Sequence, residues 1–568
     1  MKKRLTAILA MLFALLFLCG SALPNGWFRE DGSDEILRFD DMPYERPDPA
    51  VFRAIGERVS QTLNNGGGYR RLVAQLDELF NRYFSASTMS TIADIQSCRN
   101  LSDEYWAAEY AACLSALTEI ENIVEDIYLS CGASPYGDRL EREYFGPGFM
   151  AEYGENAEEK LSEAYVALLE QENNLLVEYR DTVVQPTVRV NGNEVPVSDI
   201  LYDVWGKRDY NNLLNAYYEK YNPILGDLYL RLMAVRKEQA RELGYKSYAE
   251  MMFDIGFDRD FSVEEGQAFI DSVKKWLLPV HKRCMNEDRY AELMEGYISE
   301  QQLFGALETV ARGLGGEIQQ AYEFMRRNEL ADLRMDDNKA SMSFTTYLAE
   351  YDAPFLFVNP YEDRSDIITV THEFGHYAEE YISNCAYRSM DLAEVFSQAM
   401  QFLSLRPLMS ALGEQGVAAL RLLNLYDVLD TFLWEALYAE FELRAYQLEN
   451  PSVADLNALM WSLYKEYGLD EVYDEGSVID WVDITHLFEQ PFYVISYPVS
   501  ACCALEIYER DMQTGGAGLE SYLRLADTEE IGIVAAAAEA GLQNPITDQR
   551  VQAVANFLDS QLSAWEQA

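Results

Sequence analysis

The sequence predicts a mostly α-helical protein of two lobes, with one small β-sheet beside a histidine-bearing helix. Apolar residues recur at three- and four-residue spacing through most of the chain, which is the pattern of amphipathic helices. Two runs rich in β-branched and aromatic residues, SFTTYL and APFLFVNP, interrupt this pattern and predict two strands between residues 341 and 359. At 568 residues the chain is longer than one hydrophobic core usually serves, which favours two lobes.

The first 22 residues have the pattern of a secretory signal peptide. Three basic residues at positions 2–4 precede the apolar run AILAMLFALLFLC, and the small residues GSA follow it. The run is too short to span a membrane comfortably, so we expect cleavage after Ala22 and a secreted or cell-envelope protein. The alternative is a lipid anchor at Cys19. Leu18 counts against it, because a lipoprotein signal has a small residue before the cysteine.

The rest of the chain divides into a lead-in and two lobes. Residues 23–44 are polar and contain proline, which predicts a flexible lead-in. Helical periodicity then predicts an N-terminal lobe over residues 45–185. The run TVRVNGNEVPVSDI alternates around an Asn-Gly pair and predicts a β-hairpin at the start of the second lobe, residues 186–568.

The charge balance is strongly acidic, with 45 basic and 95 acidic residues and a formal net charge of -50. Such a chain repels nucleic acid and anionic membrane surfaces, so we expect no partner of either kind. The charge favours cationic or neutral small partners. An equally good explanation of the acidic composition is solubility in a salty exterior.

Seven cysteines remain once Cys19 is set aside, an odd number without a CxxC spacing. This argues against a cysteine metal cluster and against a disulfide framework. Pairing among Cys98, Cys113 and Cys131 in an oxidising exterior stays open at this point.

The segment VTHEFGHYAEEY contains two of the four histidines of the chain. On a helix with Ser365 as candidate N-cap, His372 and His376 lie one turn apart on the same face and can reach one metal ion. Glu373 stands where it can take a proton from an activated water. The competing interpretation is that both histidines are partly buried polar residues that bind no metal. That interpretation suits a lone histidine better than two histidines at this spacing. Gly375 lowers helix stability by about 1 kcal/mol relative to alanine, which indicates that another element packs closely there.

A catalytic zinc site has three protein ligands and one open position. The helix predicted for SMDLAEVFSQAMQFLSL provides a third candidate in Glu394, a carboxylate among apolar neighbours. Asp391 in the same segment, and Glu379 and Glu380 at the end of the HExxH helix, are the competing carboxylates. Because the latter two extend the same helix beyond the histidines, geometry favours Glu394.

The segment HLFEQPFYVISYPVSACCALEIYER contains His486, Tyr493 and Tyr497. The tyrosines are four residues apart, which places them on one face of a predicted helix. A hydroxyl or imidazole donor near the metal can stabilise the oxyanion that forms when water attacks an amide. The alternative is packing, because the chain has 38 tyrosines. His281 has no companion motif and is interpreted as structural or exposed.

These segments resemble the M3 family of zinc metallopeptidases, the thimet oligopeptidase and oligoendopeptidase F group. The resemblance covers about residues 200–568. In the family's order, its segments are ARELGYKSYAEMMF, PFLFVN before TVTHEFGH, AEVFSQAMQF, YAEFELRAY, HLFEQPFYVISY and AEAGLQNPITDQRVQAVANFLDSQL. Several matches in one order are far more specific than HExxH alone.

The resemblance implies a two-lobed helical zincin shell around a deep channel that excludes folded proteins, so that substrates are short peptides. It implies one zinc ion held by His372, His376 and Glu394, with Glu373 as general base and acid. It also implies that the strand SFTTYL pairs with the peptide backbone of the substrate.

The resemblance further places His486, Tyr493 and Tyr497 among the groups that bind substrate and the transition state. Three features depart from the family's pattern. Glu379 stands where the family usually has another histidine, Gln401 stands where it often has a second glutamate, and the interval between the second histidine and the glutamate ligand is short. These positions concern groups that orient the ligands, and such changes alter metal affinity or activity by about 10–100-fold.

The expected function is a secreted zinc-dependent oligoendopeptidase that hydrolyses internal bonds of short unstructured peptides. One alternative is an exopeptidase of the dipeptidyl carboxypeptidase type on the same site. It needs a cationic pocket for a free carboxylate, and no Arg or Lys of the sequence can be assigned to one. The other is a non-catalytic secreted peptide-binding protein, which the residues at positions 379 and 401 motivate. The intact base at Glu373 argues against it, because a binding protein needs none.

Overall fold

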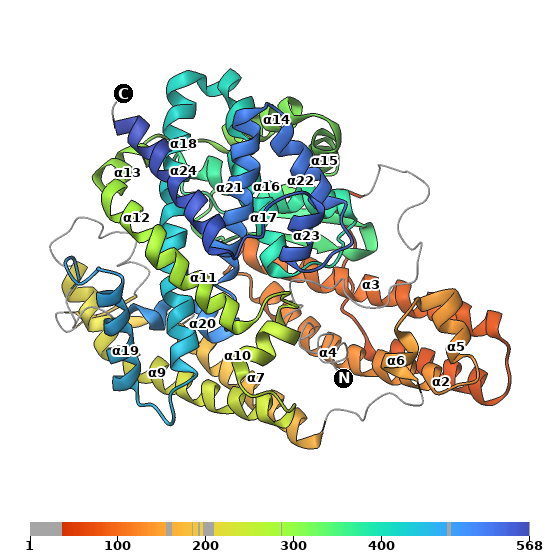
Figure 1. Ribbon diagram of the computed structural model, residues 1–568. Helices are drawn as coiled ribbons and strands as arrows, with labels where there is room; N and C mark the ends of the chain where they lie inside the picture. Colours follow the sequence, from red (N-terminus) through yellow and green to blue (C-terminus); the bar gives the residue numbers. More distant parts are fainter. Residues whose placement is uncertain are drawn as a thin grey trace.

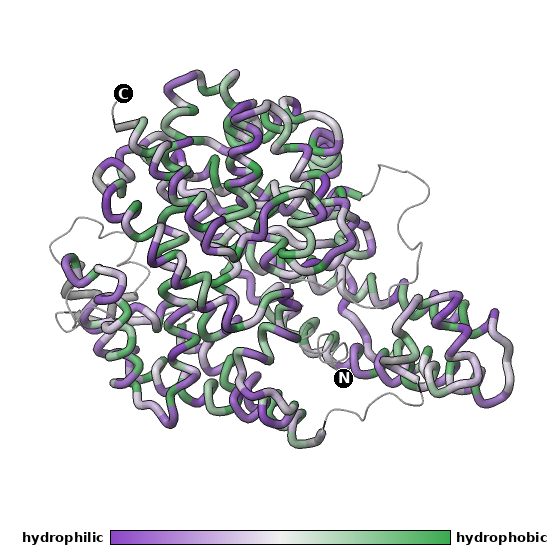
Figure 2. Tube along the Cα trace, viewed as in Figure 1, coloured by the Kyte–Doolittle hydropathy of each residue, from purple (hydrophilic) through white to green (hydrophobic). Residues whose placement is uncertain are grey.

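The computed structural model describes residues 37–154, 162–183, 186–190, 193–196, 210–285, 287–473 and 479–566. Helices form most of this part of the chain, arranged as a large body with a smaller bundle projecting from one side (Figure 1). Hydrophobic and hydrophilic residues alternate along the helices, so that each can turn an apolar face inwards (Figure 2). The prediction of a mostly α-helical class with a small sheet is confirmed.

The projecting bundle is built from long helices that pack against one another and shorter ones beside them. Its elements are α2 (Pro49–Asn64), α3 (Tyr69–Arg99), α4 (Glu104–Gly132), α5 (Gly137–Leu140) and α6 (Phe149–Tyr153). The carboxylates of Asp48 and Asp103 accept backbone N–H groups at the starts of α2 and α4. Phe52, Leu76 and Phe145 belong to an apolar core that is separate from that of the body.

Helix α3 extends from the bundle into the body. The C-terminal part of α3 contributes Met89 and Ile92 to the larger core. After the bundle helices in the chain, α7 (Glu163–Val183) packs against α9 (Tyr210–Glu242) and buries Tyr179 in the same core. The strands β1 (Thr187–Val190) and β2 (Asn193–Pro196) pair antiparallel between these helices, which confirms the predicted hairpin.

The body contains the remaining helices around one extensive core. They are α10 (Tyr248–Met251), α11 (Val263–Trp276), α12 (Leu278–Cys284), α13 (Glu287–Met294), α14 (Glu300–Leu314), α15 (Gly316–Arg327), α16 (Ser365–Ser383), α17 (Met390–Leu403), α18 (Leu405–Ala445), α19 (Val453–Glu466), α20 (Thr485–Glu489), α21 (Ser496–Gln513), α22 (Ala517–Ala526), α23 (Ile533–Glu539) and α24 (Asp548–Glu566). Helix α18 runs through the body from one end to the other (Figure 1). It bends at Gly413, where φ is 68°.

A three-stranded sheet lies against α16 in the order β3-β5-β4. The strands are β3 (Ala331–Asp332), β4 (Ser343–Leu348) and β5 (Ala353–Val358), with β3 parallel and β4 antiparallel to β5. Every residue of the central strand β5 is buried, whereas β4 forms an edge of the sheet. The two strands predicted between residues 341 and 359 are therefore confirmed.

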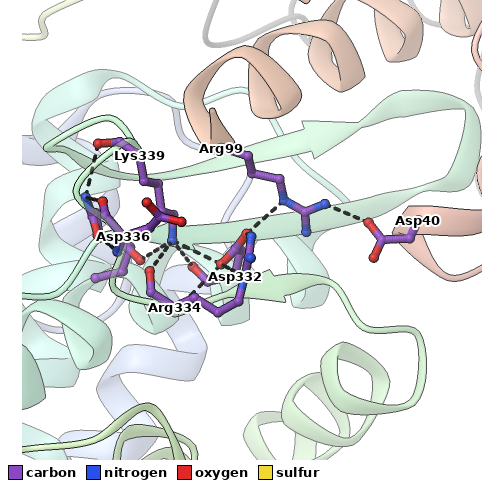
Figure 3. A network of polar contacts seen from close by, with 8 residues as sticks. Asp40, Arg99, Asp332, Arg334, Asp336 and Lys339 are labelled. Atoms are coloured by element: carbon purple, nitrogen blue, oxygen red, sulfur yellow. Dashed lines mark hydrogen bonds and ion pairs between the residues drawn. The ribbon is translucent and has the colours of Figure 1, made fainter. Parts of the chain in front are cut away.

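A buried ion network joins α3 to the sheet (Figure 3). The carboxylate of Asp332 accepts hydrogen bonds from Arg334 (2.9 Å) and Lys339 (3.0 Å), and Nε of Arg99 lies 2.8 Å from it. Burial opposes the charge of Asp332, but the three cations lower its pKa to about 2. Since Arg99 belongs to α3 and Asp332 to β3, the network fixes the bundle's longest helix relative to the sheet.

Residues 37–44 make ordered contacts, although the sequence placed them in a flexible lead-in. Phe39 is buried, with its ring centroid 4.5 Å from that of Phe355 and 4.6 Å from the guanidinium carbon of Arg99. One aromatic residue in a polar segment carries no periodicity, which is why the pattern did not reveal this anchor. The predicted signal peptide and the predicted lobe boundary at residue 185 lie outside the described residues, and both stay predictions.

Cys98, Cys113 and Cys131, whose pairing the sequence left open, form no disulfide. No helix in the described part of the chain combines the length and hydropathy of a membrane-spanning segment.

Candidate active site

Helix α16 carries the HExxH segment and begins at Ser365. Ser365 is the first helical residue rather than the cap, and its backbone N–H donates to Oδ1 of Asp363 (2.7 Å). Asp366 in the first turn accepts the N–H groups of Tyr361 (2.9 Å) and Asp363 (3.0 Å). Two aspartates thus hold the turn that starts the helix, and the N-cap predicted at Ser365 is wrong by one residue, because Arg364 occupies that position.

His372 and His376 lie one turn apart on α16 with ring centroids 5.2 Å apart. Nε2 of His372 is 3.5 Å from Oε2 of Glu394 on α17, and Nε2 of His376 is 3.6 Å from the same oxygen. The two imidazoles are 25% and 18% exposed, so the group is enclosed but can be reached from outside. The structure brings together the three residues that the sequence nominated as ligands.

Gly375 allows α16 and α17 to approach closely enough for this convergence. A Cβ at position 375 would lie 2.5 Å from the carbonyl oxygen of Phe396 and 2.6 Å from Cα of Ser397. Both distances are too short for a real side chain, so only glycine fits the crossing. The prediction that Gly375 marks the close packing of another element is confirmed.

The converging group fits a metal ion of the zinc type. The ligand atoms of His372, His376 and Glu394 all lie within 4.8 Å of one another. A tetrahedral zinc ion with bonds of about 2.0–2.2 Å holds neighbouring ligand atoms about 3.3–3.6 Å apart, close to the two separations measured here. Burial lowers the pKa of His376 to about 4, so at neutral pH its imidazole is in the uncharged form that binds metals. Burial alone would raise the pKa of Glu394, but the two histidines lower it overall.

The competing carboxylates are engaged elsewhere. Asp391 is buried and pairs with Arg259, with Nε 3.0 Å from Oδ2. Glu379 accepts a bond of 2.7 Å from Nε of Arg388. Among the described residues, neither these two nor Glu380 joins a group that could hold a metal.

Glu373 points towards the sheet. The hydroxyl of Thr345 on β4 donates to Oε2 of Glu373 (3.1 Å) and to its backbone carbonyl (2.9 Å). Glu373 is buried, which raises the pKa of its carboxyl to about 7 in spite of His372 and Thr345, which lower it. A carboxyl with a pKa near neutrality can both accept and return a proton.

His486, Tyr493 and Tyr497 form one aromatic cluster beside Glu394. The rings of His486 and Tyr493 are stacked at 5.1 Å, and Tyr497 meets both rings edge-on, at 6.1 Å from His486 and 5.1 Å from Tyr493. The hydroxyl of Tyr493 donates to Oε1 of Glu394 (2.8 Å). The prediction that Tyr493 and Tyr497 lie on one face of a helix is wrong, because α21 begins at Ser496 and Tyr493 precedes it.

Two family profiles match the sequence. The one described as the peptidase M3 N-terminal domain matches residues 39–153, and the one described as peptidase family M3 matches residues 318–525. The chain belongs to peptidase family M3. It is a metallopeptidase, and the recognition made from the sequence motifs is confirmed.

Solved structures share the fold of this M3 peptidase over nearly its whole length. An oligoendopeptidase F structure and a structure of PZ peptidase A with an inhibitor each have a TM-score of 0.76 and 21% identity. An oligoendopeptidase F from Bacillus anthracis has a TM-score of 0.73 and 20% identity. Each of the three covers 93% of this chain and 99% of its own. No curated protein sequence matches the chain.

The M3 peptidase contains a buried clamp that the motifs did not reveal, formed by Arg259 and Glu442 on either side of Phe492. Phe492 has a φ of 67°, which is uncommon for a residue with a side chain. Its N–H donates to both carboxylate oxygens of Glu442 (2.9 and 3.0 Å), and its carbonyl accepts from Nη2 of Arg259 (2.9 Å). Because Arg259 also pairs with Asp391 at the start of α17, the clamp sets Tyr493 relative to Glu394. The available signal was a single arginine between aromatic residues in GFDRDFS.

The two departures from the family's pattern have different surroundings. Oε1 of Gln401 lies 3.3 Å from Nδ1 of His372, and its amide donates to Oδ1 of Asn424 (3.4 Å). A proton on Nδ1 leaves Nε2 free as a ligand, so Gln401 orients this histidine. Glu379 instead pairs with Arg388, which also donates to backbone carbonyls at the end of α22, and therefore has a structural role.

His281 lies in a separate region, where its Nε2 is 2.7 Å from Oδ1 of Asp430. This agrees with the structural interpretation of His281.

Proposed function

We propose that this M3 peptidase is a zinc-dependent oligoendopeptidase that cleaves internal bonds of short unstructured peptides outside the cytoplasm. The observation that carries the proposal is the convergence of two imidazoles on Glu394, with the buried carboxyl of Glu373 on the same helix. A protein that only binds peptides needs neither an open metal site nor a carboxyl tuned near neutrality.

His372, His376 and Glu394 would hold the zinc ion. When bound, the ion supplies Lewis acidity towards the scissile carbonyl and towards water. Glu373 accepts the proton of the attacking water and later delivers it to the leaving amine. Thr345 keeps the carboxylate of Glu373 oriented by its hydrogen bond to Oε2.

The aromatic cluster has two tasks in this proposal. Tyr493 donates to Oε1 of Glu394 and so fixes the orientation of that carboxylate. Tyr497 and His486 are assigned as donors to the oxyanion of the tetrahedral intermediate. Burial raises the pKa of Tyr497 well above its usual value, so its hydroxyl keeps the proton that it has to donate.

The edge strand β4 explains why the substrate would be an unstructured peptide. Its neighbour in the sheet is β5, and on its other edge the hydroxyl of Thr91 reaches the carbonyl of Tyr347 (3.4 Å). The part of this outer edge before Tyr347 is left for an extended backbone to pair with. Main-chain pairing of this kind needs a segment free of its own secondary structure and depends little on side-chain identity.

We test the activity with a mixture of short peptides blocked at both ends, analysed by mass spectrometry of the products. The zinc-loaded protein should cleave internal bonds, and Glu373→Gln should bind zinc equally well but cleave at least about 100-fold more slowly. Glu414→Gln is the matched control, because Glu414 is an exposed residue of α18 next to the bend at Gly413, and it should behave like the wild type. Cleavage of peptides with free termini only would indicate an exopeptidase, and zinc binding without cleavage of either set would indicate a binding protein.

Export is tested separately by N-terminal sequencing of protein recovered from cell fractions. Signal-peptide cleavage predicts extracytoplasmic protein that begins at residue 23. A mature chain that begins with lipid-modified Cys19 would support the anchored alternative, and an uncleaved cytoplasmic chain would refute export.

A further inference from the structure

The central helix α18 presents a line of polar side chains towards the active site. Asn424 and Glu442 are 18 residues apart, which is five complete helical turns, so they project from the same line along the helix. Glu435 is seven residues before Glu442 and projects within about 20° of that line. The bend at Gly413 lies before all three, so the segment that carries them is continuous helix.

Both ends of this line are attached to the active site. Asn424 accepts a hydrogen bond from Gln401, which in turn contacts His372. At the other end, Glu442 accepts the N–H of Phe492, the residue before Tyr493. Glu435 therefore lies between these two fixed residues, on the face of α18 that is turned towards His372 at one end and Tyr493 at the other.

The carboxyl group of Glu435 is unpaired within the described part of the chain. Among the residues that the structure describes, no hydrogen bond or ion pair reaches it. The residue is only partly exposed, and burial raises the pKa of its carboxyl to about 8. Burial and the charge of Glu394 are the largest causes of the raised pKa of Tyr497, and the charge of Glu435 raises this pKa further. Glu435 therefore lies near Tyr497, the proposed oxyanion donor.

We propose that Glu435 binds a cationic group of the peptide substrate, an ammonium or guanidinium, and selects for it at one position near the scissile bond. This inference rests on the proposed peptidase function and adds a substrate class to it. With a pKa of about 8 the carboxyl of Glu435 is mostly protonated at neutral pH, so an incoming cation binds together with release of that proton. The ion pair then forms where little water competes for either charge.

The surroundings of Glu435 favour a positive group over any other ligand. The groups whose pKa values respond to the charge of Glu435 are the acid Glu442 and the phenols Tyr438 and Tyr497, and none of these three is a cation that would compete for it. The net charge of -50 also attracts cationic peptides towards the protein before they reach this face of α18.

The experiment measures selectivity on blocked peptides that differ at one position. In each pair, lysine is compared with norleucine or arginine with citrulline, and the position is moved from three residues before the scissile bond to three after it. The wild type should prefer the charged member by about tenfold or more in kcat/KM at one position, and Glu435→Gln should reduce this ratio to about one. Because the ratio is measured within one enzyme preparation, incomplete folding or zinc loading cancels. Glu414→Gln on the same helix should keep the wild-type ratio.

Peptides with a free or an acetylated amino terminus distinguish the source of the cation. A preference for the free terminus that Glu435→Gln abolishes would assign the site to the terminal ammonium instead of a side chain. Equal ratios in the wild type and Glu435→Gln would overturn the proposal while leaving the peptidase intact. Failure of all peptides to be cleaved would overturn the proposed activity. In that case the affinities of the lysine and norleucine peptides are measured for Glu373→Gln, with and without Glu435→Gln. A preference for lysine that Glu435→Gln removes would support the cation site, and equal preferences in the two variants would overturn it.

Discussion

The crossing of α16 and α17 at Gly375 provides the most direct test of the site geometry. Alanine at this position would put its Cβ 2.5 Å from the carbonyl oxygen of Phe396 and 2.6 Å from Cα of Ser397. Non-bonded carbon atoms prefer separations of about 3.5–4.0 Å, so the two helices have to move apart by about 1 Å. The movement is imposed on the backbone of α17 three residues after Glu394.

The expected effect of Gly375→Ala on stability is small, but its effect on the metal site is large. Overpacking of this kind costs about 1–3 kcal/mol, and alanine returns about 1 kcal/mol of helix propensity. Glu394, however, would be about 1 Å further from His372 and His376, which are now 3.5 and 3.6 Å from its carboxylate oxygen. Displacements of about 1 Å at a reacting group reduce rates by about 100-fold.

The assay is zinc affinity, measured by competition with a chromogenic chelator, together with kcat/KM on a blocked peptide. Gly375→Ala should lose at least about tenfold in zinc affinity and about 100-fold in kcat/KM while it remains folded. Gly305→Ala is the matched control, because Gly305 is an exposed helical glycine whose added Cβ meets no atom within 4 Å. It should gain up to about 1 kcal/mol in stability and keep wild-type zinc affinity. A folded Gly375→Ala variant with unchanged zinc affinity and rate would refute the proposed ligand geometry.

Three further predictions follow from the polar contacts. Gln401→Glu should raise zinc affinity by about tenfold, measured by the same competition, because a carboxylate strengthens the bond to Nδ1 of His372; unchanged or weaker binding would contradict the orienting role. Arg259→Met should destabilise the fold by about 3–5 kcal/mol in thermal unfolding, because it leaves Asp391 buried and unpaired. Adding Asp391→Asn should recover part of that stability but not kcat, and recovery of both would show that the clamp has no positioning role. Asp332 has its pKa lowered to about 2 by the surrounding cations, so its charge stabilises the fold above pH 4 and this contribution is lost as the pH falls towards 2. The stability difference between wild type and Asp332→Asn in urea unfolding should therefore shrink by about 2 kcal/mol between pH 5 and pH 2, and a constant difference would refute it.

The sequence predicts those parts of the molecule that depend on local spacing. The helices, the hairpin and the two strands before α16 have periodic patterns or turn residues, and the structure places them where the patterns do. The convergence of His372 and His376 follows from one helical turn, and the glycine at position 375 correctly indicates a second helix. Glu394 could be nominated because it is an acid among apolar neighbours.

Contacts between segments far apart in the chain have no such local signal. Tyr493 and Tyr497 meet because Phe492 adopts a left-handed conformation, not because they share a helical face. That conformation is held by Arg259 and Glu442, which are 233 and 50 residues away along the chain. No propensity of phenylalanine predicts a positive φ, since the strain is compensated by a tertiary contact on each side of the peptide unit.

The residues at positions 379 and 401 do not favour the non-catalytic alternative. The carboxylate of Glu379 is consumed by its ion pair with Arg388, so its presence in place of a histidine says little about the metal site. Gln401 does contact a ligand, but it offers His372 the same kind of acceptor oxygen as a carboxylate, without the charge. That difference reduces the basicity of one ligand and leaves its orientation unchanged. A protein that had lost catalysis would have no reason to keep Glu373 buried and bonded to Thr345, because a buried carboxyl without a reaction to serve only destabilises the fold.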